Sequence, residues 1–304
     1  MFTIGGQERV VGLQLPVQAR SSYFVADWEH SAGPTEMARV AVAADEAGFT
    51  YVGVCDHVAL PEAVAGSMGY HWVDPIATLG WLAAQTRQVR LLTHVYVLPY
   101  RHPRLAAKQF ATLDDLSGGR VICGVGAGHV EAEFDLLDVD FAGRGAAMDR
   151  GVTELADALA NEVVDGFGAL PRPVQSPRPP IWLAGSSAPA IRRAARLGDG
   201  WLPQGPATSQ AVELLSAELE RHGRSAEPFA VGTITPFLYV GEPSWDLPDD
   251  TLSGSPQELG ERLGASLPVG VNQIQVRFRA RSADELCDQV SAFGDGALAA
   301  LATR

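Results

Sequence analysis

Short apolar runs alternate along this chain with longer segments whose apolar residues recur at helical spacing. The apolar runs are nearly continuous, as is typical of parallel strands that are covered on both faces. They predict strands at residues 11–17, 50–55, 89–98, 120–127, 181–185, 199–204, 229–240 and 271–278. The segments that follow them predict helices at residues 34–49, 74–86, 102–117, 143–162, 188–198, 208–223, 255–267 and 282–294.

Eight strand–helix units fit a chain of 304 residues that folds as one (β/α)8 barrel, also called a TIM barrel. A doubly wound sheet would use fewer strands and would carry its glycine-rich turn directly after the first strand. We therefore predict an α/β protein with a single barrel domain over residues 1–304. In such a barrel the active site lies at the C-terminal ends of the strands.

The stretch VICGVGAGHVEAEF at first suggests a dinucleotide-binding turn instead. An apolar run leads into Gly124, Gly126 and Gly128, and an acidic helix start follows. The dinucleotide fingerprint is Gly-x-Gly-x-x-Gly, but the position of the last glycine holds His129 or Glu131. Because the stretch is also the fourth predicted strand, we interpret it as a barrel strand whose glycines let a ligand approach the backbone closely.

The composition narrows the possible partners and compartments. A formal net charge of −13 argues against nucleic acid or an anionic membrane as a partner. The sequence has no apolar run long enough to span a membrane and does not begin like a signal peptide, so we predict a cytoplasmic protein. The three cysteines are far apart and show no zinc-binding spacing, which predicts free thiols and no metal site.

Three long loops follow predicted strands, at residues 18–33, 57–73 and 241–254. Long loops at the catalytic face usually shape a pocket. These loops carry the aromatic residues Tyr23, Phe24, Trp28, Tyr70, Trp72 and Trp245. Aromatic side chains at this place suit a flat or apolar ligand, and simple packing on the barrel rim accounts for each of them singly just as well.

Two predicted strands carry residues capable of proton transfer. The second strand ends in Asp56 and His57, a carboxylate and an imidazole at a strand exit. Such a pair is often only a cap with a loop hydrogen bond, but its place in the barrel favours a catalytic role. The third strand contains His94, which either belongs to the core or points into the barrel mouth.

The fourth and fifth strand exits carry small residues. His129 follows the glycines of the fourth strand, and the acids after it, Glu131 and Glu133, are explained by the helix dipole alone. The fifth strand leads through Gly185, Ser186 and Ser187 into a helix. Small residues before a helix N-terminus form either an anion site or a plain serine N-cap, and both alternatives stay open at this point.

Three segments resemble one known family. They are AADEAGFTYVGVCDHV (43–58), the whole of residues 89–134 with its LDDLSGGRVICGVGAG motif, and PPIWLAGSSAPAIRRAARLGDGWLP (179–203). Together they resemble the bacterial luciferase-like flavin and deazaflavin oxidoreductases, and most of all the branch that depends on coenzyme F-420. The resemblance covers most of residues 10–205 and is weak beyond about residue 240. It implies a (β/α)8 barrel, a homodimer, and FMN or coenzyme F-420 at the C-terminal face.

The resemblance also implies roles for individual residues. Asp56 and His57 match an acid–histidine pair beside the reactive ring, where His57 donates or accepts the proton. His94 and Val95 match the site of a non-proline cis peptide behind the ring. The other cofactor-binding residues that the resemblance implies are Gly126 and Gly128 beside the cofactor and Gly185, Ser186 and Ser187 at its phosphate.

Two histidines depart from the family pattern. Many relatives have a small residue in place of His94, and Trp or Glu in place of His129. Two imidazoles that the pattern lacks are therefore expected in this pocket. His129 becomes a candidate acid or base specific to this protein, and the substrate of a relative cannot be transferred.

The sequence thus predicts a coenzyme F-420-dependent oxidoreductase that transfers a hydride between the deazaflavin and an organic small molecule. One alternative is an FMN-dependent luciferase-like monooxygenase that works with a separate flavin reductase. A second alternative is a flavin-binding protein without catalysis, and the presence of Asp56, His57 and the Ser186–Ser187 pair weighs against it.

Overall fold

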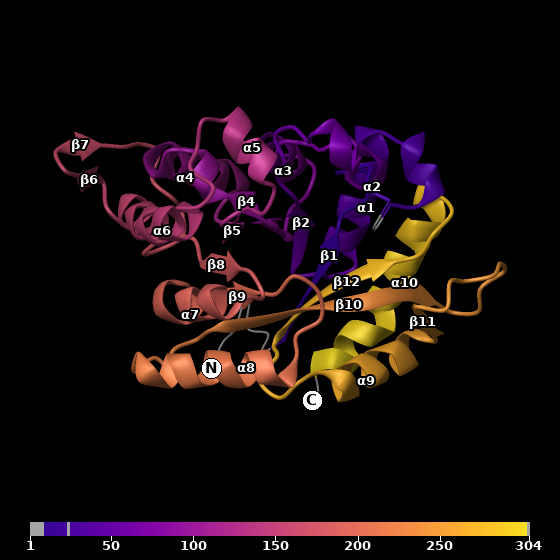
Figure 1. The fold of residues 1–304 in the computed structure, drawn as a ribbon. Helices are drawn as coiled ribbons and strands as arrows, with labels where there is room; N and C mark the ends of the chain where they lie inside the picture. Colours follow the sequence, from indigo (N-terminus) through magenta and orange to yellow (C-terminus); the bar gives the residue numbers. More distant parts are fainter. Residues whose placement is uncertain (1–8, 23–24, 303–304) are drawn as a thin grey trace.

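A closed barrel of parallel strands forms the centre of the computed structural model, which describes residues 9–22 and 25–302 (Figure 1). Residues 1–8, on which the signal-peptide argument rested, and Tyr23 and Phe24 of the first long loop lie outside the described residues. The barrel strands are β1 (Val10–Gln14), β2 (Tyr51–Val54), β3 (Arg90–Thr93) continued by β4 (Tyr96–Val97), β5 (Val121–Gly126), β8 (Ile181–Ala184), β9 (Gly200–Leu202), β10 (Ala230–Val240) and β12 (Gln273–Phe278). Pairing of β9 with β10 and of β12 with β1 closes the ring, so the predicted (β/α)8 barrel is confirmed.

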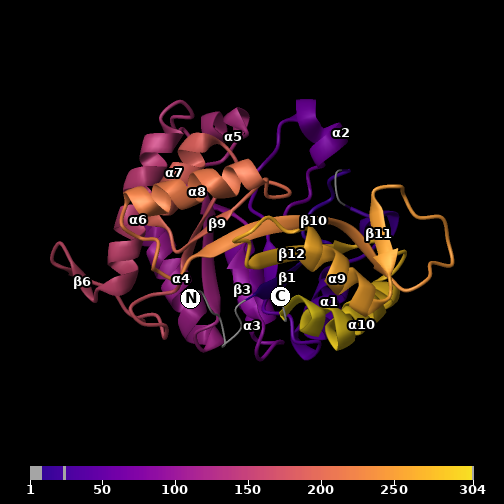
Figure 2. The ribbon, with the colours of Figure 1, turned by 90° about the horizontal axis from the view of Figure 1, so that it is seen from below.

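Helices surround the barrel and follow its strands in the predicted order (Figure 2). They are α1 (Pro34–Glu46), α3 (Pro75–Ala83), α4 (Pro103–Ser117), α6 (Arg144–Ala160), α7 (Ala188–Leu197), α8 (Ser209–Arg221), α9 (Pro256–Ser266) and α10 (Ala283–Ala302). Several begin with proline, as its fixed φ favours, and Asp74 and Ser255 cap α3 and α9 through their side chains. No helix of the described residues is both long enough and apolar enough to cross a membrane.

Alternation along the strands divides the apolar residues into two cores. Residues that point outward pack against the helices in one large cluster. Residues that point inward form a smaller cluster inside the barrel: Val10, Tyr51, Leu92, Ile122, Trp182, Leu202 and Ala230. The inner cluster fills the lower part of the barrel, so a ligand can enter only from the C-terminal end of the strands.

Glycines make room for the large residues inside the barrel. A Cβ on Gly12 would lie 2.0 Å from Cζ of Tyr51, and a Cβ on Gly124 would lie 1.9 Å from the carbonyl oxygen of Thr93. The Thr93 hydroxyl also donates to the Gly124 carbonyl at 2.7 Å. Gly124 therefore serves close packing between β3 and β5.

The third barrel strand is interrupted, whereas the sequence predicts it as continuous over 89–98. The peptide bond between His94 and Val95 is cis, as the family resemblance implies, and it separates β3 from β4. β3 pairs with both β2 and β5, and β4 pairs only with β5. The His94 N–H still donates to Val54 O at 2.6 Å, so β2 stays attached across the interruption.

Helix α10 is longer than predicted. The sequence predicts a helix over residues 282–294, but the helix continues to Ala302. A Cβ on Gly294 would lie 2.5 Å from the Ala47 carbonyl, and a Cβ on Gly296 would lie 2.8 Å from Pro256. These glycines serve close helix packing against the end of α1 and the start of α9, and that packing overrides the local stop signal.

Three short strands lie outside the predicted elements. The strands β6 (Val163–Val164) and β7 (Phe167–Gly168) form an antiparallel hairpin that projects from the barrel in both ribbon views. Asp165 and Gly166 both have positive φ, which an Asp-Gly pair between apolar residues signals, so this hairpin was readable in the sequence. Strand β11 (Thr251–Gly254) pairs with β10 at the end of a predicted loop.

Replacing Gly124 by alanine should destabilise the barrel by about 3 kcal/mol or more, because the Thr93 carbonyl cannot move away from the new Cβ. Gly66→Ala is the matched control, since no atom of the described residues lies within 4 Å of its Cβ position in α2 (Ala65–Met68). Urea unfolding monitored by tryptophan fluorescence measures both. Equal stability of the two variants would contradict this account of the inner wall.

Candidate active site

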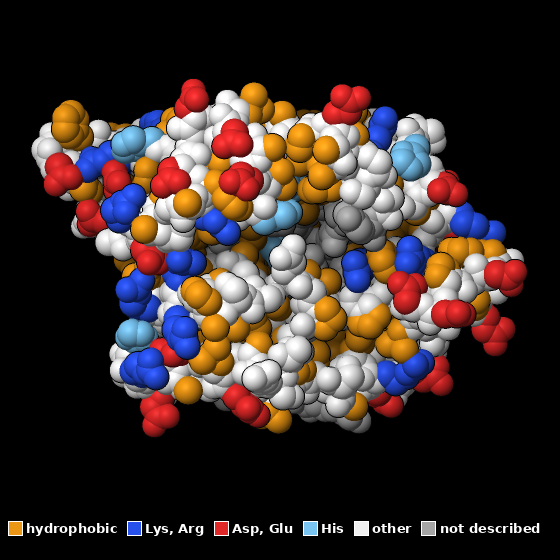
Figure 3. All heavy atoms as spheres, in the orientation of Figure 1, with side chains coloured by type: hydrophobic (Ala, Val, Ile, Leu, Met, Phe, Trp, Pro, Cys, Tyr) orange, Lys and Arg blue, Asp and Glu red, His pale blue; other side chains and the backbone are white. Residues whose placement is uncertain are grey.

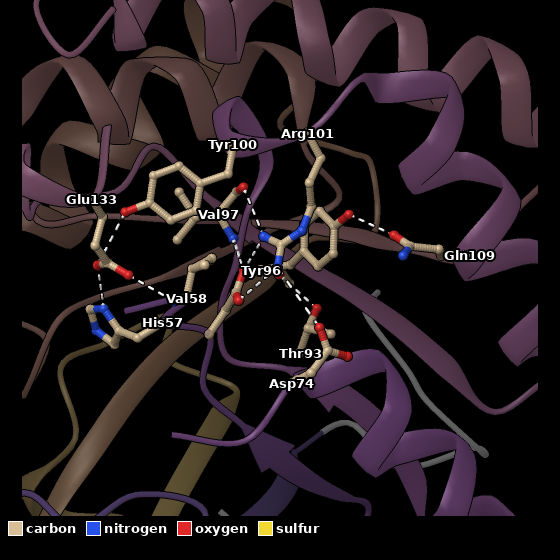
Figure 4. Close-up of polar contacts among 12 residues, drawn as sticks. His57, Val58, Asp74, Thr93, Tyr96, Val97, Tyr100, Arg101, Gln109 and Glu133 are labelled. Atoms are coloured by element: carbon tan, nitrogen blue, oxygen red, sulfur yellow. Dashed lines mark hydrogen bonds and ion pairs between the residues drawn. The ribbon is translucent and has the colours of Figure 1, made fainter. Parts of the chain in front are cut away.

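The first cluster of polar groups lies where β2 and β4 end (Figure 4). Asp56 is buried, and its Oδ1 accepts from Nη2 of Arg101 at 2.9 Å. Its Oδ2 accepts from Nη1 of Arg101 and from the Val97 N–H at 2.8 Å. The Arg101 guanidinium lies 4.2 Å from the Tyr96 ring centroid. With both oxygens occupied, Asp56 fixes the exit of β2 against β4, and the geometry favours a positioning role over proton transfer.

The second cluster holds the imidazole of His57. Its Nδ1 lies 2.6 Å from Oε2 of Glu133, on the helix α5 (Glu131–Leu136). The Glu133 side chain is fully buried. It also accepts from the Val58 N–H at 2.7 Å and from the Tyr100 hydroxyl at 3.2 Å. A carboxylate with these donors is a suitable partner for an Nδ1–H group.

The donors around Glu133 keep it ionised. Burial by itself raises the pKa of this carboxyl, but the hydrogen bond and charge of His57 and the N–H groups of Val58 and Ala59 together lower it below its usual value. The pKa of Tyr100 is raised, first by burial and then by the Glu133 carboxylate. An ionised Glu133 leaves the Nδ1 proton on His57, so Nε2 is the ring atom left for a ligand.

Two more rings lie beside His57. The Trp72 ring has its centroid 4.4 Å away and the His129 ring 5.6 Å away, both in edge-to-face arrangement. His129 is the more exposed of the two histidines and lies between β5 and α5. Its pKa is lowered, first by burial and then by the charge of His57. The structure thus brings together two imidazoles that the sequence placed on different strands.

His94 lies on the inner wall, apart from these polar clusters. Its Cβ is 3.4 Å from the Cβ position of Gly53, beside the Gln275 side chain. Burial lowers the pKa of His94 to about 4, and a hydrogen bond with Gln275 offsets only part of this effect. His94 is therefore a neutral ring at physiological pH.

The glycines of the fourth strand exit contact protein side chains. A Cβ on Gly126 would lie 2.7 Å from Cγ2 of Val95, and a Cβ on Gly128 would lie 2.8 Å from both Val97 and Phe134. Gly128 also has a φ of 78°, which favours glycine. Packing alone accounts for both glycines, and their contact with a cofactor stays a prediction.

The Gly185–Ser187 turn joins β8 to α7 at the barrel mouth. The Ser186 hydroxyl oxygen accepts from the Gln204 N–H at 2.8 Å. Ser187 is the N-cap of α7, yet its side chain makes no capping hydrogen bond, and both serines are exposed. The exposed hydroxyls and the helix N-terminus fit an anionic group such as a cofactor phosphate.

The sequence did not reveal the partners of the two predicted residues. Glu133 was explained by the helix dipole, and Arg101 and Tyr100 carried no motif. Glu133 is 76 residues from His57, and Arg101 is 45 residues from Asp56. One signal in the sequence was available: Glu133 directly precedes the apolar Phe134. Both residues are buried on the short helix α5. Within the described residues no three His, Cys, Asp or Glu side chains gather as a metal site.

Comparison with known proteins identifies the family. The family model of the luciferase-like monooxygenases matches residues 19–266. The chain belongs to this family. The predicted resemblance is thereby confirmed, and the protein is an enzyme of the luciferase-like group.

Two groups of relatives show sequence similarity to part of the chain. An F420-dependent glucose-6-phosphate dehydrogenase of Nakamurella multipartita is 32% identical over 180 residues, which are 56% of this chain and about half, 52%, of that protein. An uncharacterised protein of Mycobacterium tuberculosis is 27% identical over 217 residues, 64% of this chain and 75% of that protein.

Solved structures share the fold over nearly the whole chain. The monooxygenase RslO1 from Streptomyces bottropensis aligns with a TM-score of 0.72 and 22% identity, covering 95% of this chain and 99% of that one. The coenzyme F420-dependent tetrahydromethanopterin reductase from Methanopyrus kandleri aligns with a TM-score of 0.73 and 18% identity, covering 96% and 99%. At these identities the likeness concerns the fold alone.

The low pKa of His94 should make the protein sensitive to acid. An unfolded histidine has its ordinary pKa of 6.5, and the folded one has a pKa of about 4, so the unfolded state binds the proton first as the pH falls. Stability from this group is complete above pH 6.5 and is lost as the pH falls toward 4. Between pH 7 and pH 4.5 the wild type should lose about 2 to 3 kcal/mol more unfolding free energy than His94→Asn. Urea unfolding at both pH values measures this, with exposed His222→Asn as the control, and parallel losses in all three proteins would refute it.

Proposed function

We propose that this enzyme is a coenzyme F-420-dependent oxidoreductase acting on an organic small molecule. The carrying observation is His57 at the barrel mouth, held through Nδ1 by the buried Glu133 and leaving Nε2 for a ligand. Relatives 32% and 33% identical to this chain that are named F420-dependent dehydrogenases support deazaflavin over FMN. A hollow at this side of the molecule, with histidine side chains at its edge, offers space for the substrate (Figure 3).

The residues at the mouth fit such a cofactor. The exposed hydroxyls of Ser186 and Ser187 and the first turn of α7 would hold its phosphate. The inner wall beside His94 and Val95 and the backbone at Gly126 and Gly128 would face its ring system. When bound, the deazaflavin supplies the carbon that gives or takes a hydride.

The side chains of this enzyme would handle the proton that accompanies the hydride. Glu133 fixes the ring of His57 and its tautomer, so that Nε2 is the atom that accepts or donates the proton. His129 provides a second imidazole beside it, kept neutral by its lowered pKa. Asp56 holds the strand exit through Arg101 and acts as a positioning residue.

Direct cofactor titration tests this function. The fluorescence of coenzyme F-420 should be quenched on binding, and F-420 should bind at least about tenfold more tightly than FMN. Ser187→Ala should weaken F-420 binding by a comparable factor, because a charged hydrogen bond is lost. Ser209→Ala, a serine exposed at the start of α8, is the matched control. Tight FMN binding without F-420 binding would favour a flavin monooxygenase instead. Binding of neither cofactor would leave a catalytic role unsupported.

The role of Glu133 can be examined without knowing the substrate. In the wild type, neutral His57 should carry its proton on Nδ1, facing Glu133. Glu133→Gln should move a large part of the population to the Nε2–H form, because the amide can donate a hydrogen bond to Nδ1, which a carboxylate cannot. NMR of the protein labelled with ¹⁵N-histidine reports the tautomer. Glu131→Gln, an exposed acid on the same helix, should leave it unchanged. An unchanged tautomer in Glu133→Gln would show that Glu133 does not orient the ring.

A further inference from the structure

A guanidinium points into the barrel mouth from β12. Val10 belongs to the cluster inside the barrel, and Gln273 is its neighbour in the β1–β12 register. Because side chains alternate along a strand, Gln273, Gln275 and Arg277 all face inward. Arg277 is the last of them toward the C-terminal end. It therefore lies in the layer of the barrel that a substrate reaches first.

Arg277 has little to balance its charge. Its Nε donates to the Thr235 carbonyl at 3.2 Å, and its guanidinium lies 4.1 Å from the Phe237 ring centroid. Arg279 lies 3.6 Å from the same ring and pairs with Asp250 at 3.2 Å. Within the described residues, Arg277 has no carboxylate at ion-pair distance. Burial, followed by the nearby charge of Arg279, lowers its pKa, and Asp250 offsets this only from a distance.

The second acid near Arg277, Glu29, is occupied by hydrogen bonds from the backbone. Glu29 lines the same hollow as Arg277, together with Gln14 and Gln18. One Glu29 oxygen accepts from the Val17 N–H at 2.7 Å and the other from the Ala26 N–H at 3.0 Å. Burial raises its pKa above the usual value. Glu29 thus serves the loop backbone, and the two Nη groups of Arg277 make no hydrogen bond within the described residues.

The strand order places Arg277 away from the proton-handling side. The order around the ring is β12, β1, β2, β3 and β5. His57 follows β2, and His129 follows β5. Arg277 is thus two strands from the first imidazole and four from the second, which is half of the way around an eight-stranded ring. A molecule held at Arg277 would extend across the mouth toward the histidines.

We infer that Arg277 anchors an oxyanionic group, a carboxylate or a phosphate, of the substrate at the end remote from the reacting carbon. A guanidinium with two unused Nη groups matches such a group bidentately. Those groups lie in a partly buried place, where an anion gains more than on the open surface. That the anion belongs to a substrate rests on the proposed oxidoreductase function; the anion site itself does not.

The test uses inorganic phosphate and acetate as probes at constant ionic strength, with no cofactor present. NMR of the side-chain Nε–H groups should show the Arg277 signal shifting with either anion, and the Arg279 signal shifting much less. Arg277→Gln should weaken the binding at this site by about tenfold or more. Arg277→Lys keeps the charge but loses the two parallel N–H donors, so its anion affinity should lie between those of the wild type and Arg277→Gln. Arg221→Gln, an exposed arginine of α8, controls for net charge.

Each outcome separates the anion site from the cofactor. A shift for phosphate but not acetate assigns a phosphate substrate, and a shift for both assigns a carboxylate-compatible site. No shift of Arg277 with either probe overturns the inference. A loss of F-420 affinity in Arg277→Gln also overturns it, because Arg277 would then hold the cofactor. Anion binding at Arg277 in a protein that binds no F-420 would sink the proposed function and leave the anion site standing.

Discussion

Crowding inside the closed barrel is the constraint on which the rest of this structure depends. Eight strands bring their inward side chains within contact of one another, so large residues such as Tyr51 and Trp182 need glycine neighbours. Gly12 lies against the Tyr51 ring, and a Cβ on Gly200 would lie 2.6 Å from Trp182. The aromatic floor closes the lower barrel, and all chemistry is confined to the mouth above it.

Charges at the strand exits are buried in pairs that have different consequences. Asp56 is saturated by Arg101 and the Val97 N–H, which makes the exit of β2 rigid. Glu133 is saturated by His57, Tyr100 and backbone N–H groups, but its partner His57 keeps one ring nitrogen available. The two carboxylates thus have different roles. Asp56 fixes the backbone at the strand exit, and Glu133 orients the imidazole of His57, which that backbone carries.

The mouth is electrically uneven, although the chain as a whole carries a net charge of −13. On one side lie two imidazoles of which one has a lowered pKa, and on the other lie Arg277 and Arg279 around one aromatic ring. We propose that this arrangement orients a ligand, with its negative end at Arg277 and a neutral end toward the histidines, while Arg279 is paired with Asp250. Such orientation lowers the entropy cost of reaction.

The sequence by itself determined the order of strands and helices, because the period of the apolar residues is a local property. It also located Asp56, His57, His129 and the Gly185–Ser187 turn at strand exits, since a parallel barrel collects these ends on one face. Errors arose where packing overrode local signals, as at Gly294, whose glycine serves the contact with α1 rather than a helix stop. Only the tertiary structure decided which groups meet. Glu133 reaches His57, Arg101 binds Asp56, and Arg277 has no carboxylate partner in the described part of the chain. Ring closure, and no sequence spacing, brings these distant strand ends together.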